Sequence, residues 1–102
     1  MSVRNDTKVD LHKLLCEHIH SVYEAKNKDY GDSFSSLRKE FPEAILIRLG
    51  DKYSRLKALM KNGKAEVKDE SIEDTLLDLA NYCLMEIVER KRDRNEKAKE
   101  NE

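Results

Sequence analysis

Residues 76–88 restrict the fold of this chain more than any other segment, because as a helix they are apolar on nearly every side. A helix of that kind is buried by other elements on most of its surface. One polar stripe runs along it and its first turn, since Asp74, Asp78 and Asn81 are spaced at i, i+4 and i+7. A buried carboxylate is very costly without a cation, a metal or a water-filled cleft beside it. We therefore expect a bundle of helices with a polar stripe inside it.

The composition of the remaining chain also favours helices. Its 102 residues include only three Gly and one Pro, and Leu, Lys, Glu, Arg and Ala are abundant. No stretch alternates apolar and polar residues over the length of a strand. The sequence therefore predicts an all-α fold with three long helices and a short helical turn in one domain.

Start and stop signals give approximate boundaries for the first half of the chain. Residues 1–9 are mostly polar, which predicts a flexible N-terminus. Asp10 can cap a first helix that runs to about Lys26. Residues 27–33 are rich in Asn, Asp and Gly, which indicates a chain reversal, and a short helical turn is expected over residues 34–39.

Two further helices are expected after this turn. Pro42 suits the first position of a helix that runs to about Lys61. The third helix opens at Asp69 or Ser71, where Ser71 and Asp74 resemble a capping box. The chain beyond this helix is almost entirely charged, which is typical of a solvated extension. The predicted organisation is a flexible N-terminus over residues 1–9, a single helical domain over residues 10–89, and a charged helix extension or disordered tail over residues 90–102.

The charge and hydropathy of the chain argue against two classes of partner. A net charge of −1 gives no overall electrostatic attraction to DNA or RNA, so direct nucleic-acid binding is not expected. No apolar stretch approaches the ~20 residues that span a membrane, and the N-terminus does not resemble a signal peptide. We therefore expect a cytoplasmic protein without a membrane partner.

The cysteines and histidines do not form a convincing metal set. Cys16 and Cys83 each fall on an apolar helical face, and we expect small buried hydrophobic residues in a reducing compartment. Of the three histidines, His18 and His20 point about 200° apart on a helix, and His12 completes no pattern with them. The sequence contains no Cys-x-x-Cys or His-Glu-x-x-His motif.

The second long helix can supply cations to the carboxylates of the third. Four of its side chains share one face at three- and four-residue spacings: Arg48, Asp51, Lys52 and Arg55. If the two helices pack antiparallel, this face can meet Asp74 and Asp78. Glu70 would extend the carboxylate stripe by one turn if the third helix starts early.

Two interpretations of this pairing are open. In the first, Asp78 and an arginine form an interhelical ion pair that fixes the packing register. In the second, mixed acids and bases line a cleft, where carboxylates hold Mg²⁺ and Arg and Lys hold phosphate oxygens. The spacing does not choose between them, because structural ion-pair networks gather the same groups.

The segment from Lys26 to Ser33 offers further candidate contacts. Lysines such as Lys28 and backbone N–H groups can bind phosphate at a turn of this kind, and Tyr30 could stack on a base. The alternative is a solvated turn with Tyr30 packed on the core. The chain has no Walker-type Gly-rich loop and no Ser/His/Asp or Cys/His nucleophile set.

Self-association follows from the apolar third helix. Three long helices cannot easily cover a helix that is apolar on every face. We therefore expect a homo-oligomer in which part of residues 76–88 is buried against a neighbouring subunit. Ligand sites between the helices of such bundles are common.

Three sequence blocks, in order, carry a resemblance to known families. They are residues 28–34 (KDYGDSF), residues 48–52 (RLGDK) followed by Arg55 and Leu56, and residues 69–71 (DES) leading into residues 74–82 (DTLLDLANY). Over about residues 11–88 the chain resembles the phage-encoded nucleotide modification associated domain 1 family. More distantly, residues 74–82 are similar to the acidic helix of the MazG-like all-α nucleoside triphosphate pyrophosphatases.

The MazG-like resemblance implies an oligomeric helical bundle in which paired acids on adjacent helices coordinate Mg²⁺, which helps water attack between the α and β phosphates. Carried over by position, the metal ligands would be Asp74 and Asp78, both also catalytic, with Asp51 and Glu70. The ligand contacts would be Arg48, Lys52, Arg55, Asn81 and Tyr82. The chain departs from the family pattern, since it has Asp-x3-Asp in place of Glu-x2-Asp and only Asp51 on the partner helix. These departures weaken the expected metal site, which hydrolysis requires more than nucleotide binding does.

We therefore expect a nucleotide-binding protein, with Mg²⁺-dependent nucleoside triphosphate pyrophosphatase activity as its first candidate reaction. One alternative is a non-catalytic anti-defence sponge that sequesters a nucleotide-derived immune signal, for which the basic residues would matter more than the acids. If the chain is phage-encoded, it would act in the host cytoplasm. Another alternative is a helical self-association module whose polar stripe only sets the register.

Overall fold

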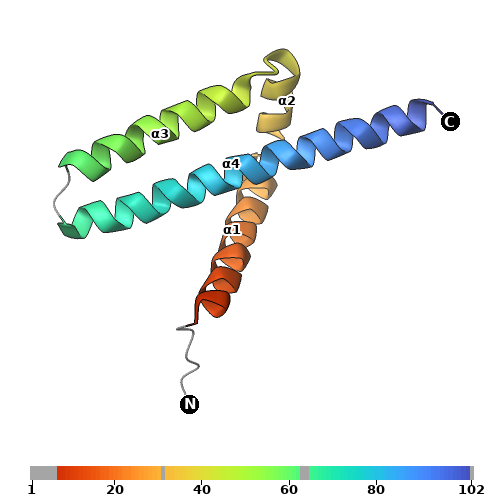
Figure 1. Cartoon of the computed structure of the whole chain (residues 1–102). Coiled ribbons are helices and arrows are strands. Elements are labelled where there is room, and N and C mark those ends of the chain that lie inside the picture. Colours follow the sequence, from red (N-terminus) through yellow and green to blue (C-terminus); the bar gives the residue numbers. More distant parts are fainter. Residues whose placement is uncertain (1–6, 31, 63–64, 102) are drawn as a thin grey trace. The chain divides into compact units, whose positions relative to one another are not determined.

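The computed structural model of the chain describes residues 7–30, 32–62 and 65–101, with the side chains of these residues except 29–30 and 65–70. The described residues form α-helices and contain no strand. The helices are α1 (Lys8–Tyr30), α2 (Ser33–Glu40), α3 (Ala44–Asn62) and α4 (Ala65–Glu100) (Figure 1). The predicted all-α fold, with three long helices and one short helix, is confirmed.

The helix α1 belongs to a compact unit of its own, Met1–Asp32, and is described by itself. Its N-cap is Thr7, whose side-chain oxygen accepts a hydrogen bond from the backbone N–H of Asp10 at 3.1 Å. Asp10 instead lies in the first turn, where a negative charge complements the helix dipole. The helix also continues through residues 27–30, which were expected to turn, and ends with Lys28 in its last turn. The turn-forming tendency of Asn27 and Asp29 was therefore not sufficient to end the helix.

The second compact unit, Ser33–Glu102, contains α2, α3 and α4. In it α3 packs against α4, and the two helices run side by side and antiparallel (Figure 1). Helix α3 begins two residues after Pro42, because residues 42–43 form a turn in which the Ala44 N–H bonds to the Phe41 carbonyl at 2.9 Å. The antiparallel arrangement on which the pairing of the two polar faces depends is therefore present.

Helix α4 is longer at both ends than the sequence signals indicated. It begins at Ala65, before Asp69 and Ser71, so the expected capping box lies within the helix. It also continues to Glu100, and the charged segment after residue 89 is a helix extension. Lys, Arg, Glu and Ala are strong helix formers, so a solvated extension of this composition can stay helical. No helix in the described residues is long and apolar enough to cross a membrane.

The short helix α2 is held against α4 by both apolar and charged contacts. The ring of Phe34, which is 9% exposed, lies 6.0 Å from the ring of Tyr82, measured between centroids, at an interplanar angle of 53°. The Ser35 hydroxyl donates a hydrogen bond to Glu89 at 2.7 Å. These contacts place Tyr82, expected as a ligand contact, in the packing of α2 on α4.

A buried carboxylate forms the charged part of this contact. Glu86 is 7% exposed, and the Arg38 guanidinium binds both of its oxygens, at 2.8 Å from Nε and 3.0 Å from Nη2. Arg90 donates a further hydrogen bond to Glu86 at 2.7 Å, and Arg38 also bonds Asp93 at 2.8 Å. We call these four residues the Glu86 clamp. Paired donors of this kind offset the cost of burying the charge.

The Glu86 clamp shifts the ionisation of its members. The pKa of Glu86 lies below its ordinary value, chiefly because Arg38 donates hydrogen bonds to the carboxylate, with Arg90 adding to the effect and burial opposing it. The same hydrogen bonds raise the pKa of Arg38, and the bond from Arg38 lowers the pKa of Asp93. Folding therefore favours the ionised form of the Glu86 carboxyl.

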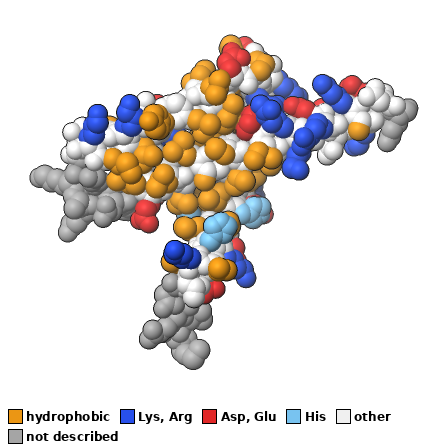
Figure 2. Space-filling view, in the orientation of Figure 1, with side chains coloured by type: hydrophobic (Ala, Val, Ile, Leu, Met, Phe, Trp, Pro, Cys, Tyr) orange, Lys and Arg blue, Asp and Glu red, His pale blue; other side chains and the backbone are white. Residues whose placement is uncertain are grey.

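Few apolar side chains of the described residues are buried. Only Phe34 and Ala44 among them are buried hydrophobic residues, whereas several large apolar side chains on α3 and α4 are about half exposed or more. Examples are Leu46 (69%), Ile47 (65%), Leu84 (51%) and Ile87 (49%). Figure 2 shows hydrophobic side chains spread over the surface of the α3–α4 pair. Self-association remains a prediction, and these exposed side chains are available for it.

Replacing Glu86 tests the clamp. Glu86→Gln should lower the free energy of unfolding at neutral pH by about 1–3 kcal/mol, because charge-assisted hydrogen bonds to Arg38 and Arg90 are lost. In the unchanged protein the stabilisation is present above the ordinary Glu pKa of about 4.3 and is lost as the pH falls through the lower folded value. Denaturant unfolding at pH 3 to 7 should therefore show a weaker pH dependence for the variant. Glu96→Gln, at an exposed position of α4, is the matched control, and an equal effect of both changes would contradict this role.

Candidate functional site

The interface of α3 and α4 joins two of the residues that the sequence singled out. Lys52 Nζ on α3 lies 3.2 Å from Asp78 Oδ2 on α4. The two side chains are 26% and 42% exposed, so the pair lies at the edge of the interface and not in its interior. The interhelical ion pair expected of Asp78 is present, with a lysine in the place of the expected arginine.

One helical turn away, a second polar contact joins the same two helices. Arg55 Nε donates to Thr75 Oγ1 at 3.3 Å, and the Thr75 hydroxyl donates to the backbone carbonyl of Ser71 at 2.7 Å. Thr75 is 2% exposed, which makes it the most deeply buried polar side chain of the described residues. Hydrogen bonding on both sides compensates its burial. We call Lys52, Arg55, Thr75 and Asp78 the polar seam.

The two contacts of the polar seam share one antiparallel register. A step of three residues forward along α3, from Lys52 to Arg55, corresponds to a step of three residues back along α4, from Asp78 to Thr75. Residues three apart lie on neighbouring positions of one helix face, so both helices present their polar groups on matching turns. The seam therefore sets how far α3 is displaced along α4.

The other predicted site residues are not all brought to this seam. Asp74, Arg48 and Asp51 are exposed, and Asn81 is half-buried. Lys28 is exposed on α1, in the other compact unit. The side chains of Tyr30 and Glu70 lie outside the described residues. The structure therefore joins Lys52 to Asp78, pairs Arg55 with Thr75 one turn away, and leaves the remaining contacts as predictions.

A complete metal site is not formed within the described side chains. No group of three or more His, Cys, Asp or Glu residues lies close enough there to hold a metal ion. Asp74 and Asp78 are one helical turn apart on α4, and Asp51 is on the adjacent helix. Mg²⁺ is often held by one or two carboxylates together with water and substrate phosphates, so a partial set of this kind is chemically suitable. A magnesium site remains a prediction.

Two residues with structural roles were not identified from the sequence. Thr75 lies three residues before Asp78, and this spacing places both side chains toward α3. Glu86 interrupts the apolar segment 76–88, four residues before Arg90, which is the spacing of a helical ion pair. Both signals were readable, but the partner residues Arg55 and Arg38 come from distant parts of the chain.

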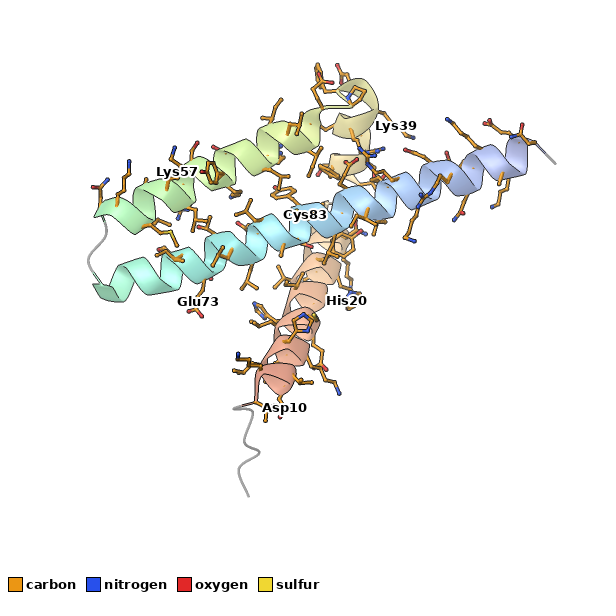
Figure 3. All side chains as sticks on the ribbon, viewed as in Figure 1. Asp10, His20, Lys39, Lys57, Glu73 and Cys83 are labelled. Atoms are coloured by element: carbon orange, nitrogen blue, oxygen red, sulfur yellow. The ribbon has the colours of Figure 1, made fainter. Side chains whose placement is uncertain are left out.

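A double-mutant cycle measures the coupling across the polar seam. Lys52→Met and Asp78→Asn should each weaken the fold slightly, with a coupling energy of about 0.5–1 kcal/mol, because the pair is partly exposed. The charge swap Lys52→Asp with Asp78→Lys should recover most of this coupling. Glu73→Gln is the control, since this carboxylate is exposed and points away from α3 (Figure 3). A coupling near zero in denaturant unfolding would show that the ion pair has no effect on stability.

Comparison with known families gives one match, over the segment that contains the polar seam. A family model described as nucleotide modification associated domain 1 matches residues 26–89, which is more than half of the chain. The match extends from the last residues of α1 through α2 and α3 into α4. No curated protein and no solved structure shows a significant match to the chain.

Proposed function

The chain belongs to the nucleotide modification associated domain 1 family, and from this premise we propose that it binds a nucleotide at the polar seam. The observation that supports this proposal most directly is the ion pair between Lys52 and Asp78. It brings a cation and a carboxylate from two helices together at a position that solvent reaches. Ligands commonly bind between the helices of a bundle.

The cations of α3 suit the phosphates of a nucleotide. Arg48 and Arg55 are exposed and flank Lys52 at three- and four-residue spacings. Thr75 accepts a hydrogen bond from Nε of Arg55. A guanidinium has four further N–H donors, in a fork that matches phosphate oxygens. Arg55 can therefore be oriented by Thr75 and still bind a ligand.

The ion pair itself can open for a ligand. A partly exposed lysine–carboxylate pair contributes only about 0–1 kcal/mol, so little stability is lost when the lysine turns to another anion. A phosphate group carries more negative charge than Asp78 and offers several acceptor oxygens. In this proposal Lys52 exchanges Asp78 for phosphate when the ligand binds. Asn81 and Tyr82, which follow Asp78 on α4, are the proposed contacts to the rest of the nucleotide.

Calorimetry with the full chain tests the binding proposal. Adenosine and guanosine triphosphates, their monophosphates and cyclic dinucleotides form a suitable panel. Lys52→Met and Arg55→Met should each weaken binding of the best ligand by about tenfold or more, because each removes a charge-assisted hydrogen bond. Arg92→Met, an exposed cation outside the family-matched residues, should leave the affinity unchanged. Absence of binding across the panel, or an equal loss in the control, would disprove the proposal.

Hydrolysis is the second candidate function, and the observation that favours it is that Asp74 and Asp78 lie one helical turn apart on α4, with Asp51 on the adjacent helix α3. These carboxylates would hold Mg²⁺, with Glu70 as a further proposed ligand. The metal would supply charge neutralisation and activation of water for cleavage between the α and β phosphates. The residues of α3 would hold the phosphates in place, which is the larger part of what a protein contributes to such a reaction.

A turnover assay separates hydrolysis from sequestration. With Mg²⁺ and nucleoside triphosphates, a pyrophosphatase should release pyrophosphate, and Asp78→Asn should reduce the rate at least a hundredfold, while Glu73→Gln should not. Tight binding without turnover would instead support the alternative of an anti-defence sponge for a nucleotide-derived signal. Enzyme activity that Asp78→Asn leaves unchanged would contradict the assigned role of this residue.

We also propose that the chain acts as a homo-oligomer. The exposed side chains that support this proposal include Leu46 and Ile47 on α3 and Leu84 and Ile87 on α4. Exposed apolar side chains that lie close together are typical of protein interfaces. The polar seam could instead serve only to set the register of a self-association module. In that case single substitutions at Lys52 or Asp78 would weaken assembly, the charge swap of both residues would restore it, and no nucleotide would bind.

A further inference from the structure

Helix α1 carries a pair of metal-ligating side chains outside the polar seam. Cys16 Sγ lies 3.8 Å from Nδ1 and 4.0 Å from Nε2 of His12, one helical turn earlier. Both residues are exposed, as is Cys83, so the prediction that the cysteines are buried is wrong. His12 and Cys16 also lie outside residues 26–89, so neither the family match nor the proposed nucleotide site includes them.

The distance between the two ligand atoms suits chelation of one metal ion. Zinc binds thiolate sulfur at about 2.3 Å and imidazole nitrogen at about 2.0–2.1 Å in tetrahedral sites. A tetrahedral angle between these bonds places sulfur and nitrogen about 3.6 Å apart. The observed distances of 3.8 and 4.0 Å exceed that value by a few tenths of an ångström. Because Sγ lies almost equally far from the two ring nitrogens, the imidazole has to turn until one nitrogen and the sulfur face a common ion. Both side chains are exposed, so they have room for this rotation.

The pair provides only half of a tetrahedral site. Within the described residues no third His, Cys, Asp or Glu joins it in a metal-binding group. On the helix, His12 and Cys16 fall on the same side as Leu15 and Ile19, within the apolar stripe of α1. Leu11 and Leu15 are 48% and 49% exposed. Association of two such stripes would bring two His12–Cys16 pairs together.

We propose that α1 contains half of a transition-metal site, and that a second copy of the chain completes it as a tetrahedral Cys₂His₂ centre. Thiolate and imidazole ligands select zinc and related metals, whereas Mg²⁺ and Ca²⁺ prefer oxygen. On binding, each Cys16 thiol releases one proton to solvent, and its thiolate sulfur forms the bond to the metal. The site therefore differs in both place and metal class from the proposed magnesium site on α4.

Cobalt titration of the full chain, under a reductant that does not bind metals, tests this site. Co²⁺ should give the absorption of tetrahedral thiolate coordination, at one ion per two chains, together with a dimer in analytical ultracentrifugation. Cys16→Ser should abolish the thiolate absorption. His12→Ala should weaken binding of Zn²⁺ by at least about tenfold, since even changes around a metal ligand have effects of that size.

Glu17→Gln is the matched control, because this exposed side chain is on the same helix but on the side opposite both the pair and the apolar stripe. It should leave both metal binding and dimer formation unchanged, and circular dichroism confirms that each variant stays helical. Three results would overturn the proposal: no thiolate absorption, absorption that persists in Cys16→Ser, or one ion per chain without a dimer. In metal-free protein without reductant, a dimer that disappears when reductant is added would indicate a disulfide in place of the metal site. None of these outcomes depends on nucleotide binding.

Discussion

A carboxylate in the middle of an apolar helix is stable only where donors surround it, and Glu86 obtains them from both α2 and α4. Arg38 reaches it across the chain with a two-point contact, while Arg90 approaches from the next turn of α4. Because Phe34 and Ser35 also contact α4, the short α2 is held by adjacent apolar and charged interactions. The position of α3 follows in part, since α2 leads directly into it through residues 41–43. Breaking one partner of such a pair leaves the other charge uncompensated.

The polar seam acts on the same helices in a different way. Its ion pair between Lys52 and Asp78 is partly solvated, so it contributes little to stability and remains able to exchange partners. The neighbouring Thr75 is fully buried and hydrogen-bonded on both sides, so it resists displacement. A fixed contact beside an exchangeable one suits a binding site, where one group orients the cation and another is available to the ligand.

The packing of α3 on α4 leaves much apolar surface open to solvent. Ala44 is buried, but Leu46 and Ile47 nearby are exposed, and Leu84 and Ile87 show the same on α4. Two helices bury only one stripe of each other, and α4 is apolar on more than one side. Few apolar side chains are therefore buried among the described residues of 33–101, and contacts with another copy would add to this core. This is the physical link between the thin core and the proposed assembly.

The sequence by itself determined the helical class and showed that a buried Asp78 needs a cation, a metal or a water-filled cleft, because these follow from local periodicity and from the cost of an unpaired charge. Periodicity does not give the direction in which two helices pack, so the antiparallel packing of α3 on α4 was decided by the tertiary structure. Helix ends were less predictable. Capping signals are present at Asp10 and Ser71, but α1 and α4 each begin earlier in the chain, at Lys8 and Ala65. Only the tertiary structure decided that Lys52 pairs with Asp78, and that the pair is half exposed, because depth depends on how much of α4 is covered by α3. The same holds for the contact of Arg38 with Glu86, whose partners are 48 residues apart. Sequence spacing determines which side chains share a helix face, whereas packing determines which of them meet.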